Sequence, residues 1–115
     1  MKTFGASKEF LIGSEKEWET VGEGVERQIM GYDDQIMMVN VKFAKGGIGP
    51  MHQHPHSQVT YIAKGQFKMT IGDETRILDA GDSFYIPSNV VHGLVCLEEG
   101  LLIDVFSPIR EDFMS

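Results

Sequence analysis

An alternation of apolar and polar side chains, with a period of two, constrains the fold more than any other feature. It runs through residues 34–43, 57–63, 66–72 and 100–106, which are rich in β-branched, aromatic and methionine side chains. Successive side chains of a strand point to opposite faces, so the pattern predicts strands that bury one face.

Turn residues separate these runs about every 8–12 residues, a spacing typical of a sandwich or barrel. The predicted breaks are Gly31, Asp33–Asp34, Gly46–Gly47, Lys64–Gly65, Gly72–Asp73, Ala80–Gly81–Asp82 and Glu99–Gly100. The segment Ser14–Val21 has helix formers and Ser14 as a candidate cap, but it is short and also compatible with a strand. Short antiparallel strands without helices to cover an open sheet predict an all-β fold, either closed or built of two sheets.

Length and charge limit the classes of function. The 115 residues suit a single domain, which we expect to span residues 1–115. The formal net charge of −7 argues against nucleic acid and anionic membrane as partners, but not against a small anionic substrate. Cys96 is the only cysteine, and the first residues contain no apolar stretch typical of a secretion signal. We therefore expect a protein of the reducing cytoplasm.

A cluster of histidines is the strongest sign of chemistry in the sequence. His52 and His54 point the same way in an extended chain, and Gln58 shares their parity if the strand continues. His92 would add a ligand from a distant strand. The set predicts one divalent transition metal per chain, and zinc, nickel, manganese and iron all accept such ligands. We expect the remaining histidine, His56, to be a solvated surface residue.

Four other residues admit more than one interpretation. Cys96 is more typical of a small buried strand residue than of a nucleophile. Asp104 interrupts an apolar strand, where a buried carboxylate is costly unless it is paired or used, although it could instead lie on an exposed face or cap a turn. Phe106 suits either a core position or a wall of a substrate pocket. Arg110 suits either solvated surface or a carboxylate-binding role, because its planar fork matches a carboxylate.

Two motifs, at about residues 46–96, resemble those of the cupin family. The first comprises Gly46, His52, His54, Gln58 and Gly65, and the second comprises Gly81, Pro87, His92 and Cys96. The resemblance covers about residues 35–106 and implies a single-domain cupin, a jelly-roll β-barrel with the metal inside. Gln58 stands where the family has glutamate, Asn89 where it has glycine and Cys96 where it has asparagine. Without a carboxylate ligand the metal charge is not offset, which favours a Lewis-acid or anion-holding role over an iron dioxygenase.

The segment from Asp104 to Phe113 is similar to the closing segment of the KdgF-type cupins of pectin and alginate breakdown. Those proteins convert 4,5-unsaturated uronates to linear 5-keto-4-deoxyuronate. The resemblance rests on Asp104, Phe106 and Arg110, together with the three histidines and the glutamine. It implies that these three residues line the pocket and take part in catalysis, and that Arg110 and Phe106 bind a small anionic sugar acid.

Two other classes of function stay open at this stage. One is a non-enzymatic cupin that binds a sugar acid, and the other is a metal-dependent oxygenase. The family resemblance also implies a homodimer, for which we expect Phe10, Leu11 and Ile12 to be candidates for pairing along a strand edge.

Overall fold

The computed structural model describes residues 4–114, and strands make up most of it. The strands are β1 (Glu19–Gly22), β2 (Val25–Asp33), β3 (Ile36–Phe43), β4 (Ile48–His52), β5 (Ser57–Ile71), β6 (Glu74–Asp79), β7 (Ser83–Ile86) and β8 (His92–Ser107). Two single turns of 3-10 helix complete the regular structure, η1 (Gly13–Glu15) and η2 (Glu111–Phe113). Within residues 4–114 no helix is long and apolar enough to span a membrane.

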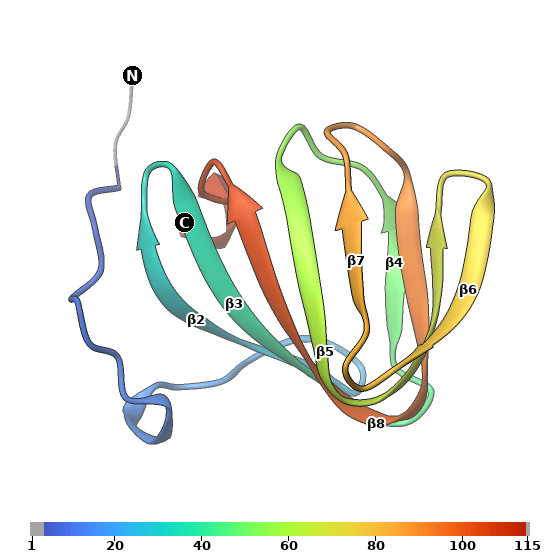
Figure 1. Ribbon diagram of the computed structural model, residues 1–115. Coiled ribbons are helices and arrows are strands. Elements are labelled where there is room, and N and C mark those ends of the chain that lie inside the picture. Colours follow the sequence, from blue (N-terminus) through green and yellow to red (C-terminus); the bar gives the residue numbers. More distant parts are fainter. Residues whose placement is uncertain (1–3, 115) are drawn as a thin grey trace.

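The strands form an antiparallel barrel. Hydrogen bonds connect them in the order β1-β2-β3-β8-β5-β6, while β4 pairs with β8 and β7 pairs with β5. Figure 1 shows β2 and β3 on one side of the molecule and β4, β6 and β7 on the other, with β5 and β8 bending between them. This architecture confirms the prediction of an all-β jelly-roll fold.

The breaks predicted at Lys64–Gly65 and Glu99–Gly100 are wrong, because β5 and β8 run continuously through them. The two strands instead bend and cross closely there, and their register shifts between Ile62 and Phe67. A Cβ on Gly65, whose φ is +93°, would lie 2.6 Å from the carbonyl oxygen of Glu98, and one on Gly100 would lie 2.3 Å from that of Lys64. Glycine is needed at both positions for the approach of two backbones rather than for a turn.

Most of the other predicted boundaries agree with the structure. Turns occur at or beside Asp33–Asp34, Gly46–Gly47, Gly72–Asp73 and Ala80–Gly81–Asp82. Gly31 is an exception, because it lies inside β2, where the register with β3 shifts between Ile29 and Tyr32. The segment Ser14–Val21 contains part of η1 followed by part of β1, so both of its readings are partly right.

Residues 4–12 are irregular chain that leads into η1, so the strand expected at Phe10, Leu11 and Ile12 does not form. The side chain of Gln28, on β2, donates hydrogen bonds to the carbonyl oxygens of Gly13 (2.7 Å) and Lys16 (3.1 Å). Ser7 adds a backbone hydrogen bond from its N–H to the carbonyl oxygen of Tyr32 (2.9 Å). The segment is thus fastened to β2 by isolated hydrogen bonds and not by a continuous ladder. Phe10 is 88% exposed.

The core fills the barrel between the two sides. Its fully buried side chains come from alternating positions of the strands and include Met37, Val39, Ile62, Phe67, Ile86 and Leu102. Cys96 is among them, which confirms the prediction of a small buried strand residue. Its thiol donates to the carbonyl oxygen of Glu98 over 3.0 Å, and burial raises its pKa, so it is a poor nucleophile.

Candidate metal centre

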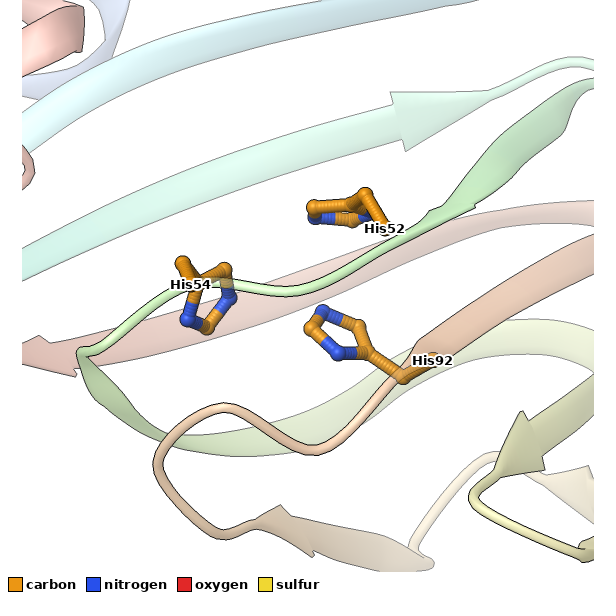
Figure 2. A group of neighbouring side chains, drawn as sticks. All are labelled: His52, His54 and His92. Atoms are coloured by element: carbon orange, nitrogen blue, oxygen red, sulfur yellow. The ribbon is translucent and has the colours of Figure 1, made fainter.

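Three histidines converge at one end of the barrel. His52 ends β4, His54 lies in the segment that follows, and His92 begins β8 directly opposite His52 in the ladder. Figure 2 shows the three rings grouped around a common space. One ring nitrogen from each lies within 4.8 Å of the others. The structure thus brings together the three histidines that the spacing singled out.

Backbone carbonyl groups orient all three rings. The Nδ1 atoms of His52, His54 and His92 are hydrogen-bonded to the carbonyl oxygens of Pro50 (2.7 Å), His56 (3.0 Å) and Val90 (2.9 Å), each two residues away. A carbonyl oxygen only accepts, so each Nδ1 carries the proton and each Nε2 of a neutral ring carries a lone pair. This is the arrangement by which proteins prepare imidazoles as metal ligands.

Gln58 adds an oxygen to the cluster. Its Nε2 donates to the hydroxyl of Thr60 over 3.0 Å, and that hydroxyl donates to Asp104 over 2.6 Å. The amide oxygen therefore faces the other way, toward His54 Nε2 at 3.0 Å. Both of these atoms present lone pairs, which repel at this distance unless they share a proton or a cation.

Burial disfavours a proton at this position. It lowers the pKa of His92 to about 4, and it lowers the pKa of His54 as well, with a further contribution from the Arg110 charge. Both rings are therefore neutral at pH 7. The Nε2 of His92 is buried and has no hydrogen-bond partner within the described residues. Three neutral imidazoles and an amide oxygen fit a divalent transition metal, and the donor types alone do not select which one.

Asp104 lies in β8 opposite Thr60 of β5 and opposite Val39 of β3. It faces the inside of the barrel, so the readings of an exposed acid and of a turn cap are both wrong. Its Oδ1 accepts hydrogen bonds from Thr60 (2.6 Å) and, at a longer 3.4 Å, from Gln58. Burial raises the pKa of this carboxyl to about 6, even though these hydrogen bonds and the Arg110 charge favour the ionised form.

Arg110 is 9% exposed, so the reading of a solvated surface arginine is wrong. Its guanidinium carbon lies 5.0 Å from the ring centroid of Phe106 and 4.2 Å from that of Phe113. Asp112 accepts two hydrogen bonds from it. Phe106 is 2% exposed and belongs to the core, which confirms that interpretation, and its ring also contacts His54. Its role as a wall of a substrate pocket stays a prediction.

A pocket of about 800 Å³ connects these groups, a size suited to a small organic ligand. Its walls include His52, Gln58, His92, Asp104, Phe106 and Arg110. These six are among the seven side chains that the sequence predicted to form a site. The seventh, His54, completes the histidine cluster beside it.

Two residues near the site were missed or misread. His56 is half-buried and not solvated, because its Nε2 donates to the carbonyl oxygen of Ile109 over 3.1 Å and so fastens the segment that carries Arg110. Arg27 reaches into the pocket from β2, with its guanidinium carbon 3.8 Å from the ring centroid of Phe113. Arg27 lies two positions after Val25 in β2, so the two side chains share the inward face of the strand. This shared parity was the signal available in the sequence.

Comparison with known proteins places these features in a family. The sequence model described as "Cupin domain" matches residues 39–106. The pectin degradation protein KdgF of Dickeya dadantii (strain 3937) is 47% identical over 109 residues, which cover 93% of this chain and 99% of that protein.

Solved structures agree with the sequence matches. An RmlC-like cupin from Shewanella frigidimarina NCIMB 400 superposes with a TM-score of 0.93 at 44% identity, covering 96% of this chain and 99% of that one. KdgF from Halomonas sp. superposes with a TM-score of 0.89 at 39% identity, covering 93% of this chain and 99% of that one. These matches confirm the resemblance found in the sequence motifs.

Proposed function

The chain belongs to the cupin family, and we propose that it opens the ring of 4,5-unsaturated uronates from pectin or alginate breakdown, giving linear 5-keto-4-deoxyuronate. The observation that carries the proposal is a single pocket where a histidine cluster, an inward-facing carboxyl group and a buried guanidinium meet. The similarity to a protein named for pectin degradation supports this choice of substrate class.

In this proposal His52, His54, Gln58 and His92 hold one divalent transition metal. When bound, the metal supplies positive charge that stabilises negative charge developing on a substrate oxygen. The four ligating groups are neutral, so they do not offset that charge. Their carbonyl and hydroxyl partners keep the lone pairs aimed at one point before the metal arrives.

The reaction is an isomerisation and needs no oxidant. The proton of the anomeric hydroxyl leaves, and the electron pair of that O–H bond forms the C1 carbonyl. The bond between C1 and the ring oxygen breaks, and its electron pair forms the C5 carbonyl. The electron pair of the C4–C5 double bond then takes up a proton at C4. One acid–base group that accepts a proton and returns one is sufficient.

Asp104 is the acid–base group in this proposal. Its hydrogen bonds from Thr60 and Gln58 both reach Oδ1, which leaves Oδ2 for the transferred proton. Because Asp104 sits in the ladders of β8 with both β3 and β5, its backbone is fixed on two sides. A carboxyl group held in this way keeps its reach to the substrate constant through the reaction.

Arg110 and Phe106 bind the substrate. Arg110 carries a permanent charge that suits the carboxylate of a uronate, and its burial among aromatic rings strengthens that attraction. Phe106 walls the pocket beside Asp104. The carboxylate lies at one end of the sugar acid, so holding it fixes which carbon faces Asp104.

The test is a turnover assay with an unsaturated galacturonate monomer. Metal-loaded protein should remove the absorbance of the conjugated double bond faster than a protein-free control, without oxygen uptake, and NMR should identify the linear keto acid. Asp104→Asn should abolish most of the rate, while Glu111→Gln, which changes an exposed acid nearby, should not. Oxygen consumption would instead indicate an oxygenase, and ligand-induced stabilisation without turnover would indicate a binding protein.

A further inference from the structure

The carboxylate of Asp112 occupies one edge of the Arg110 guanidinium. Its two oxygens accept from Nε over 3.0 Å and from Nη2 over 2.8 Å, which is a bidentate pairing. A guanidinium carries five N–H groups, and this pairing uses two of them. Of the remaining three, one on Nη1 and one on Nη2 form a second edge that can bind another carboxylate in the same way.

The two partners differ in their relation to the pocket. Arg110, Phe106 and Phe113 line it, whereas Asp112 is absent from the described residues that do so. The side chain of Arg110 is 11% exposed and that of Asp112 is 60% exposed. Asp112 therefore approaches the guanidinium from the solvent side, and a ligand in the pocket does not have to displace it.

Aromatic rings restrict the same guanidinium in another direction. Its carbon lies 4.2 Å from the ring centroid of Phe113, and Arg27 contacts that ring too, at 3.8 Å. The rings of Phe106 and Phe113 lie at 86° to each other, so the planar guanidinium can face only one of them squarely. Facing a ring leaves the guanidinium free to rotate within its own plane. The bidentate pairing with Asp112 removes that rotation. The hydrogen bonds from Arg110, and to a smaller degree its charge, lower the pKa of Asp112, which keeps the carboxylate ionised.

From this geometry we infer that Asp112 is a positioning residue, which holds the Arg110 guanidinium so that its second edge receives the carboxylate of a sugar acid in the pocket. The inference rests on the proposed function and deepens it, because it assigns specificity for an acid to a pair of residues. Asp112 itself does not touch the substrate. It keeps the long side chain of Arg110 ordered in advance, so substrate binding does not lose the entropy of ordering that side chain.

The experiment uses metal-loaded protein and three variants, Asp112→Asn, Arg110→Ala and Glu111→Gln. Glu111 is the matched control, since it is an exposed acid of the same 3-10 helix. The probes are saturated galacturonate, which has no double bond to react, and its uncharged methyl ester. Calorimetry gives Kd for each probe, and the turnover assay separates KM from kcat for the unsaturated uronate.

Asp112→Asn should weaken galacturonate binding about 3- to 10-fold, the scale for immobilising one long side chain. It should raise KM by a similar factor, with kcat and ester binding unchanged. Arg110→Ala should weaken galacturonate binding more strongly, and Glu111→Gln should match the wild type.

Three outcomes would overturn the inference. Tighter galacturonate binding by Asp112→Asn would mean that Asp112 competes with the substrate for Arg110. Unchanged binding would mean that the pairing has no role in recognition, and equal weakening of acid and ester would mean a general structural role. A different result would sink the proposed reaction alone. If the wild type binds galacturonate but does not turn over the unsaturated uronate, and Asp112→Asn selectively weakens binding of the acid, then the positioning role stands without the reaction.

Discussion

Replacing Asp104 with asparagine should stabilise the protein while removing its activity. The carboxyl group faces the inside of the barrel, and burial raises its pKa from 3.8 to about 6. Asparagine has the same shape, keeps an oxygen to accept from Thr60, and carries no charge to desolvate. The variant therefore separates the cost of the charge from the shape of the side chain.

The size and sign of the effect follow from that pKa. Because the folded-state pKa lies above the ordinary value, ionised Asp104 lowers the stability of the fold, and the penalty grows as pH rises from about 4 to about 6. A shift from 3.8 to about 6 corresponds to about 3 kcal/mol at about 1.4 kcal/mol per unit. The side chain is only half-buried, so we expect a gain of about 1–3 kcal/mol in the variant above pH 7, and about a third of that gain near pH 4.5.

Urea unfolding of metal-stripped wild type and Asp104→Asn, at about pH 4.5 and about pH 8, measures this difference. Metal is removed because a nearby cation would favour the ionised carboxylate. Turnover of the unsaturated uronate is then measured on metal-loaded samples of the same preparations. It should fall about 100-fold or more, the usual scale for deleting an acid–base group.

Two results would refute the reasoning. If the asparagine variant is less stable at high pH, or if its gain does not depend on pH, then ionised Asp104 is not disfavoured by burial. If the variant is fully active, Asp104 is not the proton carrier, whatever its effect on stability.

Three further predictions concern the metal and the barrel. His92→Ala should lose most of the roughly one transition metal per chain found by elemental analysis, whereas His56→Ala should retain it and raise KM, because its ring fastens the Arg110 segment at Ile109; equal metal losses would contradict this choice of ligands. Gln58→Glu should keep its metal but turn over more slowly, since an added negative charge offsets the metal; an unchanged rate would remove that argument. Gly65→Ala should cost about 3 kcal/mol or more in chemical unfolding, because the new Cβ meets backbone 2.6 Å away; a loss below about 1 kcal/mol would show that the crossing can relax.

The residues of the site were readable from the sequence because their signals are local. His52, His54 and Gln58 share the parity of an extended chain, and the structure brings His92 to them across the ladder of β4 and β8. Asp104 was conspicuous as an acid in an apolar run. The all-β class followed from the alternation and the spacing of the turn residues, while the jelly-roll barrel and the family followed from the motifs.

The errors share one physical cause, which is that sequence patterns report on single strands and not on contacts between them. Gly65 and Gly100 look like turn residues, yet they serve the crossing of two long strands at the place where Lys64 pairs with Leu101. The anchoring of His56 at Ile109 and the stacking of Arg27 on Phe113 also join distant segments. No periodicity carries that information.

The central place of β8 in the sheet determines when this protein can fold during its synthesis. Without β8, the ladder order leaves β1, β2 and β3 as one fragment and β5, β6 and β7 as another, while β4 has no partner. The ribosome therefore releases most of the strands before any of them can close the barrel, and His92 emerges with the same late strand. We expect nascent chains that end before β8 to be sensitive to protease and unable to retain metal. A separately supplied β8 peptide should restore protease resistance and metal retention together.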